Sequence, residues 1–320
     1  MTSLRSKLLL ATAACLSSGA FAEGPFPSTY EAPEHSPTLI TNATVLTGDG
    51  RRLDSANVYF ANGRIVEVSN SALEVAADTQ VIDAQGRWVT PGVIDVHSHL
   101  GVYPSPDVDA HSDGNEATAP VTAEVWAEHS IWPQDPGFGR ALAGGVTTLQ
   151  ILPGSANLFG GRAVTLKNVA SVSYQGMKFP DAPYGLKMAC GENPKRVYGR
   201  KGSGPSTRMG NIAGYRTAWI KAQDYRDEHA KYAALSSEER QETKKPKRDL
   251  ELETLAGVLD GEIIIHMHCY RADEMLTILD LAQEFDYKVG TFHHGVEAYK
   301  IADELAENDV CGALWADWWG

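Results

Sequence analysis

Two histidines separated by a single residue stand at the end of a short apolar run. Val93, Ile94 and Val96 lead into His97 and His99. In a β-strand, residues i and i+2 point to the same side, so the two imidazoles are directed at one point. Imidazole is a ligand that suits zinc, and a catalytic zinc ion keeps one coordination position open for water. The spacing therefore predicts a metal site at the end of a buried strand.

Two later apolar runs also end in histidine pairs. His266 and His268 close one run, and His293 and His294 stand before Gly295 at the end of the other. A single buried histidine is more often a hydrogen-bonded core residue than a ligand. Three pairs in one chain favour a common metal site.

The runs that carry these pairs belong to a chain that alternates strands with helices after residue 99. This alternation predicts a parallel sheet with crossover helices. Helices are expected over residues 272–285 and 296–307, with one apolar stripe each, on the outside of the sheet. Seven strands are expected, near residues 93–97, 146–151, 163–167, 185–189, 263–268, 288–292 and 311–315.

The region before the first histidine pair has a different pattern. Residues 39–90 hold short β-rich runs broken by turn residues, among them Asn62 and Gly63, a strong hairpin signal. These runs predict a small antiparallel β module, which follows an extended mature N-terminus at residues 23–38.

A long polar insertion covers residues 193–250. It contains a charged stretch at residues 224–248 and a capping-box signature from Ser236 to Glu239. A solvated helical excursion is the preferred interpretation, and an active-site lid is the alternative.

Residues 1–22 are typical of a secretory signal peptide. Arg5 and Lys7 precede an apolar stretch, and residues 20–22 fit a small-residue cleavage site. The apolar stretch is too short for a membrane span. We therefore expect cleavage after about Ala22 and a secreted or periplasmic protein.

Charge and cysteine content limit the partners and the redox chemistry. The formal net charge is −13, and loss of residues 1–22 takes it to about −15, so nucleic acid is a poor partner. The remaining cysteines, Cys190, Cys269 and Cys311, are an odd number dispersed among apolar residues. They are expected to be buried thiols and not a disulfide framework.

The segment around the first histidine pair resembles the amidohydrolase superfamily and, more narrowly, its imidazolonepropionase-like branch. The resemblance is carried by Pro-Gly-x-x-Asp-x-His-x-His at residues 91–99 and by Gly-Val-Thr-Thr at residues 145–148. It covers the chain from about residue 39 onward. It implies a (β/α)8 TIM-type barrel that binds one or two divalent metal ions, with Zn²⁺ expected, and a small β-sandwich built from the chain ends.

The resemblance also implies the metal ligands. At the fifth strand, alignment on residues 271–273 selects His268 and places His266 one layer deeper. At the sixth strand, the His-Gly register favours His294. The implied histidine ligands are His97, His99, His268 and His294.

A carbamylated lysine at the end of the fourth strand often adds a bridging carboxylate in this superfamily. Lys187 is the candidate, because an unpaired lysine inside an apolar strand is costly to bury. Lys167 is the competitor, and a lysine that extends to the barrel mouth is the alternative interpretation. Without carbamylation the site would hold a single metal ion.

Substrate contacts are less well indicated. Tyr103 is a candidate for the pocket wall, and Arg271 is a candidate for binding a substrate carboxylate, with pairing to Asp273 as the alternative. The glycine-rich segment 154–162 is expected to be a tight loop near the substrate. Trp315, Trp318 and Trp319 either face the substrate or serve packing.

The eighth strand of the superfamily ends in an aspartate that binds metal and acts as general base, and no matching segment follows the seventh strand here. Asp317 is not placed there by the resemblance. We therefore expect seven barrel strands and a fragment of a longer protein, with the general base unknown.

The expected activity is metal-dependent hydrolysis of a C–N bond in a cyclic amide or a small peptide-like amide, through metal-activated water. The alternative is a truncated, catalytically inactive metal-binding barrel. The expected partner is a small-molecule amide or dipeptide, without nucleic acid or a membrane span, and self-association into a homo-oligomer is left open.

Overall fold

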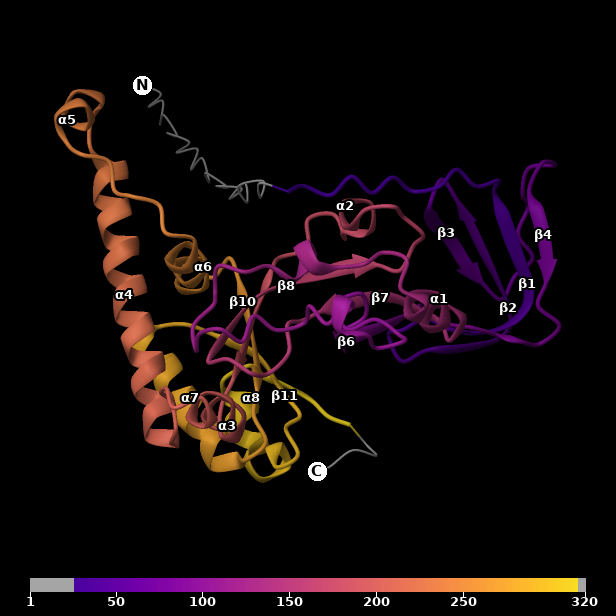
Figure 1. The fold of residues 1–320 in the computed structure, drawn as a ribbon. Helices are drawn as coiled ribbons and strands as arrows, with labels where there is room; N and C mark the ends of the chain where they lie inside the picture. The colour runs from indigo at the N-terminus through magenta and orange to yellow at the C-terminus, as the bar shows by residue number, and fades with distance from the viewer. Residues whose placement is uncertain (1–25, 316–320) are drawn as a thin grey trace, which may run out of the picture.

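The computed structural model describes residues 26–315 and shows a mixed α/β fold around one large sheet (Figure 1). This sheet has seven strands in the order β12-β11-β10-β9-β8-β7-β6. The strands are β6 (Val93–Ser98), β7 (Val146–Ile151), β8 (Phe159–Lys167), β9 (Gly185–Ala189), β10 (Ile264–His268), β11 (Val289–His293) and β12 (Cys311–Ala313). All seven expected strands are therefore present, and β7 and β9 have the predicted bounds.

One strand of this sheet runs against the others. β8 pairs antiparallel with both β7 and β9, whereas the remaining pairs are parallel. The expectation of an all-parallel barrel is therefore wrong at β8. The physical reason is the short connection 152–158 after β7, because a parallel return requires a crossover of roughly a dozen residues or more.

The helices cover the sheet as the apolar stripes predict. In α7 (Ala272–Phe285), Met275, Ile278, Ala282 and Phe285 are buried at spacings of three and four residues, and they join the largest apolar core. The helix expected over residues 296–307 is divided into η3 (Ala298–Ile301) and α8 (Ala302–Glu307). The other helical segments of this region are η1 (Asp109–His111), η2 (Ala127–Ser130), α1 (Pro136–Ala143) and α2 (Tyr174–Met177).

The polar insertion is helical, as predicted. It contains α3 (Glu192–Arg200), the long α4 (Arg208–Ala234), α5 (Ser237–Glu242) and α6 (Leu250–Leu259). Figure 1 shows α4 extending away from the sheet with α5 at its far end. α5 begins with the expected capping box, in which Ser236 and Glu239 each bind the other's backbone N–H. The insertion is thus a structured excursion, and its base packs on the core through Tyr215 and Trp219.

The N-terminal strands form a separate five-stranded sheet at the opposite end of the molecule from α4 (Figure 1). Its strands are β1 (Thr38–Leu46), β2 (Arg52–Ala61), β3 (Arg64–Ser69), β4 (Gln80–Asp83) and β5 (Trp88–Val89). The order is β3-β2-β1-β4, and β5 also pairs with β1. The module is mixed and not antiparallel as predicted, because β4 and β5 both run parallel to β1. The expected sandwich is not confirmed within residues 26–315.

The cysteine prediction is wrong. Cys190 and Cys269 form a disulfide, although 79 residues separate them in the sequence, and Cys311 is exposed. Their closeness follows from the sheet, in which β9 and β10 are parallel neighbours and each cysteine directly follows its strand. The disulfide was not predicted because the two cysteines are distant in the sequence and are brought together only by the pairing of β9 with β10.

Two predictions concern the ends of the chain and the membrane. The proposed signal peptide, Asp317, Trp318 and Trp319 lie outside the described residues. Among residues 26–315, no helix combines the length and the apolar character that crossing a bilayer requires.

Candidate metal centre

The three histidine pairs meet at the carboxyl ends of β6, β10 and β11. His97 Nδ1 lies 2.8 Å from His293 Nδ1, and His97 Nε2 lies 3.2 Å from His99 Nε2. His266 Nδ1 lies 3.0 Å from His293 Nε2. β6 stands at one end of the strand order and β11 near the other, so the curvature of the sheet brings the pairs together.

Lys187 lies among these histidines. It belongs to β9, pairs in register with His266 and is 0% exposed. Its Nζ is a buried amine without a hydrogen-bond partner among the described residues. Burial lowers the pKa of this amine to about 7. A buried unpaired amine is destabilising, so it indicates a site whose chemistry needs that group.

The competing lysine, Lys167, lies at the opposite end of the strands from the histidine pairs. Because β8 is reversed, its last residue, Lys167, pairs with Thr148 near the start of β7. The Lys167 ammonium rests over the rings of Tyr30 and Phe179, at 4.9 and 4.5 Å from their centroids. Lys167 is therefore separated from the histidine pairs by the length of the strand.

The six imidazoles are held in the neutral form. Burial lowers every one of their pKa values, and the positive charge of Lys187 lowers each of them further. The pKa falls to about 4 in His99, His266 and His294 and to about 2 in His268 and His293. Neutral imidazole is the form that binds metal, because a protonated ring has no free lone pair.

His294 takes an unusual backbone conformation. Its φ of 57° is left-handed, which is uncommon for a residue with a Cβ. The ring stacks on Trp315 with centroids 4.0 Å apart and lies 4.8 and 4.7 Å from the rings of His97 and His268. Local backbone strain of this kind is concentrated at functional sites.

Neighbouring polar groups orient two of the rings. His99 Nδ1 lies 2.8 Å from the carbonyl oxygen of Leu152, so the Nδ1–H donates and the Nε2 lone pair faces the cluster. His268 lies between Ser155 Oγ, 3.1 Å from its Nδ1, and Asn193 Nδ2, 3.1 Å from its Nε2. Such contacts restrict both ring rotation and tautomer.

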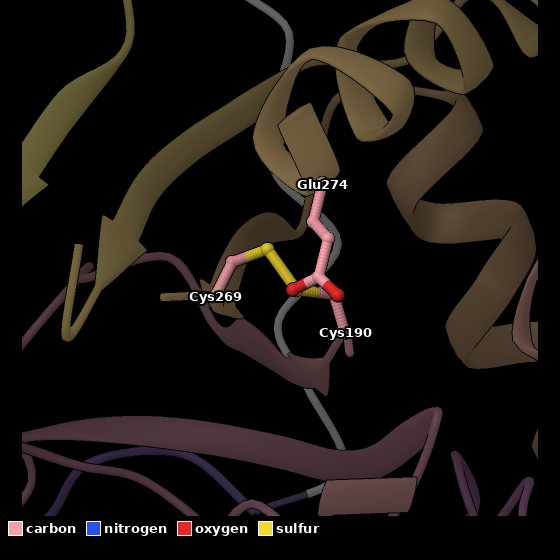
Figure 2. Close-up of side chains that lie close together, drawn as sticks. All are labelled: Cys190, Cys269 and Glu274. Carbon is pink, nitrogen blue, oxygen red and sulfur yellow. A yellow bond between two sulfur atoms is a disulfide. The ribbon is translucent and has the colours of Figure 1, made fainter. Parts of the chain in front are cut away.

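These donors are paired and are not arranged as a finished three-ligand set. Within residues 26–315, no three histidines each place one ring nitrogen within 4.8 Å of the others. The group that meets this distance is Cys190, Cys269 and Glu274, and Figure 2 shows that its two sulfurs are bonded to each other. The donor chemistry of the histidine cluster still fits a divalent metal, because it combines neutral imidazoles with an unpartnered amine.

Comparisons with known proteins address the family. No protein-family model matches the chain. The crystal structure of an amidohydrolase from Thermotoga maritima is 38% identical in sequence and superposes with a TM-score of 0.79, covering 87% of this chain and 70% of that one. The chain belongs to the amidohydrolase superfamily. Its fold is of the TIM-barrel type found in this superfamily, with the reversed β8 as a local departure.

Curated amidohydrolase relatives are similar over part of their length. Amidohydrolase tasK of Hapsidospora irregularis is 34% identical over 301 residues, which are 84% of this chain and 30% of tasK. Imidazolonepropionase of Chromobacterium violaceum is 32% identical over 143 residues, which are 38% of this chain and 34% of that enzyme. The alignments thus span about a third of these curated relatives.

Two residues were expected to contact the substrate. Tyr103 lies near the histidine cluster, and Arg271 follows His268 by three residues in the sequence. The Tyr103 ring faces His99 at 5.7 Å between centroids, and its hydroxyl lies 3.3 Å from Asn115 Oδ1. Arg271 makes a bidentate ion pair with Asp273, at 2.9 and 2.7 Å, which is the alternative considered for it.

The sequence placed His293 in a histidine pair but favoured His294 as the ligand, and the His293 ring contacts both His97 and His266. Two further residues that contact the cluster were not predicted from the sequence. Ser155 lies in the glycine-rich loop that was expected near the site. Asn193 opens the polar insertion, where no spacing signal marks it.

Proposed function

We propose that this amidohydrolase hydrolyses a C–N bond in a cyclic amide or a small peptide-like amide, with a bound divalent metal ion. The observation that carries the proposal is the convergence of six neutral imidazoles around the unpartnered amine of Lys187. Membership of the superfamily, which is generally dependent on divalent metal ions, supports this proposal, and both named relatives are described as amidohydrolases.

His97, His99, His268 and His294 are proposed to hold the metal, with Zn²⁺ as the expected ion. When bound, such an ion lowers the pKa of a water molecule and polarises a carbonyl group. His99 is oriented for this role by the Leu152 carbonyl group. Trp315 covers His294 and restricts access of bulk water to that ring.

Lys187 is proposed to carry a carbamate if two ions bind. An amine with a pKa of about 7 is neutral in a substantial fraction of molecules at neutral pH, and the neutral amine is the form that reacts with carbon dioxide. The carbamate would replace an isolated amine with a carboxylate, a group that can bridge two metal ions.

Tyr103 is proposed to form part of the substrate pocket, because its ring lies beside His99. Arg271 is proposed to bind a substrate carboxylate that displaces the Asp273 carboxylate, because the Arg271 guanidinium is paired with Asp273 in the structure. The existing bidentate pair shows that the group is presented in the geometry that a carboxylate requires.

We also propose that the protein works in the periplasm or outside the cell. Residues 1–22 have the composition of a signal peptide, and the Cys190–Cys269 disulfide fits an oxidising compartment.

Substitution of the first histidine pair tests the proposed function. His97→Ala with His99→Ala should abolish bound metal and reduce hydrolysis of a panel of cyclic amides and dipeptides by at least about 100-fold. The control is His111→Ala with His129→Ala, which removes two histidines outside the cluster. Metal content by elemental analysis and hydrolysis by mass spectrometry are measured together.

The outcomes separate the candidate functions. Unchanged metal content and hydrolysis in the His97 and His99 variant would contradict the proposal. Metal bound by the unsubstituted protein without hydrolysis of any amide would favour a non-catalytic metal-binding barrel.

A further inference from the structure

α3 places an arginine beside the histidine cluster. The helix follows shortly after β9, the strand that carries Lys187. Asn193 Nδ2 donates to His268 Nε2 at 3.1 Å, and Arg196 Nη2 donates to Asn193 Oδ1 at 3.3 Å. Two hydrogen bonds through one amide group therefore connect the Arg196 guanidinium to an imidazole of the cluster.

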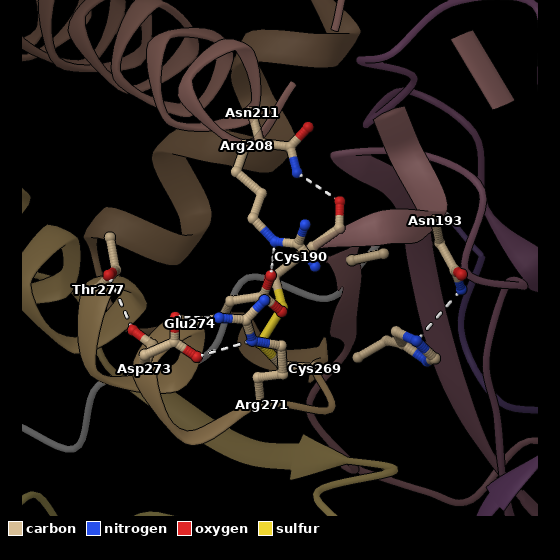
Figure 3. The surroundings of a disulfide bond; sticks show 12 residues. Cys190, Asn193, Arg208, Asn211, Cys269, Arg271, Asp273, Glu274 and Thr277 are labelled. Atoms are coloured by element: carbon tan, nitrogen blue, oxygen red, sulfur yellow. Dashed lines mark hydrogen bonds and ion pairs between the residues drawn. A yellow bond between two sulfur atoms is a disulfide. The ribbon is translucent and has the colours of Figure 1, made fainter. Parts of the chain in front are cut away.

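α3 is held firmly, so the backbone that carries Arg196 has a fixed place. Pro194 and Tyr198 are its buried residues, and the Tyr198 hydroxyl donates to the carbonyl oxygen of Ala119 at 2.6 Å. Just before the helix, the carbonyl oxygen of Gly191 accepts a hydrogen bond from Asn211 Nδ2 at 2.8 Å (Figure 3). Arg196 itself is exposed, so a ligand can reach it from solvent.

The hydrogen-bond donors beside His268 have few acceptors. A guanidinium carries five N–H donors and no acceptor, and the bond to Asn193 is the one hydrogen bond that Arg196 makes within residues 26–315. Arg196 forms no ion pair with any residue in this part of the chain. The Tyr270 ring lies 4.5 Å from the His268 ring between centroids, and its hydroxyl has no hydrogen-bond partner among the described side chains and backbone groups.

The charge of Arg196 acts on the same side of the cluster. Burial raises the pKa of the Tyr270 hydroxyl, the Glu192 carboxylate raises it further, and the Arg196 guanidinium opposes both effects. Arg196 and Tyr270 are therefore within electrostatic range of each other. Glu192 is exposed and is not paired with Arg196, so the guanidinium stays available to an anion.

Arg271, the other arginine near the cluster, is already paired. Its guanidinium makes two hydrogen bonds to the Asp273 carboxylate, at 2.9 and 2.7 Å (Figure 3). A carboxylate ligand must displace Asp273 from Arg271, whereas it can bind Arg196 without breaking an ion pair. A carboxylate is an acceptor-only group that matches the planar guanidinium, often through two parallel hydrogen bonds.

We propose that Arg196 is a specificity-determining residue that binds a carboxylate of the substrate, so that the enzyme prefers amides with a carboxylate close to the scissile nitrogen. The inference rests on the proposed function and deepens it, because it names the substrate class and the arginine that recognises it. In a dipeptide or an N-acyl amino acid, one carbon atom separates the scissile nitrogen from the carboxylate. Such a substrate is short enough to place its amide at the histidine cluster and its carboxylate at α3.

Binding of a matched pair of small ligands tests the assignment. N-acetylglycine and N-acetylglycinamide share the acyl amide, and only the first carries a carboxylate. Dissociation constants are measured by ligand-observed NMR titration for the unsubstituted protein, Arg196→Gln and Arg200→Gln. Arg200 is the control, because it is an exposed arginine of the same helix.

The unsubstituted protein should bind N-acetylglycine about 10-fold more tightly than the carboxamide, since a hydrogen-bonded charge pair contributes that much or more. Arg196→Gln should remove this preference, and Arg200→Gln should retain it. An equal affinity for the two ligands, or a preference that survives Arg196→Gln, would overturn the proposal. Loss of the preference in Arg271→Gln alone would overturn it as well and would assign the carboxylate to Arg271.

Turnover gives a second readout. For dipeptides that the protein hydrolyses, Arg196→Gln should raise KM by about 10-fold and change kcat by less than about 2-fold, because a contact remote from the reacting bond holds substrate and transition state alike. The matching dipeptide carboxamides should respond little. A fall in kcat with an unchanged KM would contradict a role in carboxylate binding.

Failure of the proposed function gives a different result. A protein that hydrolyses no amide of the panel would contradict the proposed function. In that case the preference for N-acetylglycine, and its loss in Arg196→Gln, still decide whether Arg196 binds a carboxylate.

Discussion

At the scale of single residues, the histidine cluster brings together Lys187 and six histidines whose charged forms are disfavoured by burial. Lys187 has no partner for its amine among the described residues, and the six surrounding imidazoles are neutral. Because Lys187 lowers the pKa of every one of these histidines, a proton added anywhere in the cluster is unfavourable. Bringing these groups together reduces the stability of the metal-free fold and favours a bound cation that accepts imidazole lone pairs.

The cluster predicts acid sensitivity of the metal-free protein. In the unfolded chain these histidines bind protons below about pH 6.5, whereas in the fold His99, His266 and His294 do so only near pH 4. Between these values the unfolded state holds more protons, so the free energy of unfolding should fall as pH falls, by up to about 1.4 kcal/mol per pH unit for each histidine. Urea unfolding at pH 7 and pH 5 after chelator treatment measures this.

His266→Asn provides the comparison for this pH dependence. It removes one of the histidines, so the slope of unfolding free energy against pH should decrease between pH 6.5 and 4. A free energy of unfolding that is flat between pH 7 and pH 5 in the unsubstituted protein would contradict the pKa directions.

At the scale of elements, the reversed β8 is anchored by a buried ion pair beside it. The Glu128 carboxylate is fully buried in η2 and lies 2.8 Å from the Lys178 ammonium and 3.1 Å from the Tyr184 hydroxyl. Lys178 also donates to the carbonyl oxygen of Phe26 at 2.7 Å, so the N-terminal segment is tied to the same network. The network joins segments that the reversal of β8 places side by side.

Removal of Lys178 should destabilise the fold strongly. Lys178→Met leaves the Glu128 carboxylate buried without its cation, which typically reduces the free energy of unfolding by about 3–5 kcal/mol. The control is Arg216→Met, which breaks the exposed pair with Glu284 and should change it by less than about 1 kcal/mol. Denaturant unfolding compares the two, and equal effects would show that the buried network contributes no more than a surface pair.

At the scale of the whole molecule, one end of the large sheet exposes apolar side chains. β6 and β12 end the strand order, and β6 exposes Val93, Ile94 and Val96 by half or more. Apolar edge strands with free backbone groups promote association.

A charge on this edge should reduce self-association of the 320-residue chain. Ile94 is 63% exposed, and Ile94→Lys should raise the concentration at which light scattering detects oligomers by several-fold. Val172→Lys is the control, because Val172 is 92% exposed but lies outside the strands. An equal response of the two variants, or an unsubstituted chain that stays monomeric at all concentrations, would contradict the prediction.

The sequence by itself determined the features that depend on local periodicity and short spacing. The bounds of β7, β9 and α7 were predicted correctly because each is an apolar pattern between clear turn or capping residues. The convergence of His97 and His99 with the later histidine pairs was also expected, since the strands that carry them are parallel and end on one side.

Only the tertiary structure decided the features that depend on strand direction and pairing. Reversal of β8 removed Lys167 from the site and left Lys187 within it. Pairing of β9 with β10 joined Cys190 to Cys269 across 79 residues. Such contacts follow from the order and direction of whole strands, which depend on the free energy of the complete sheet.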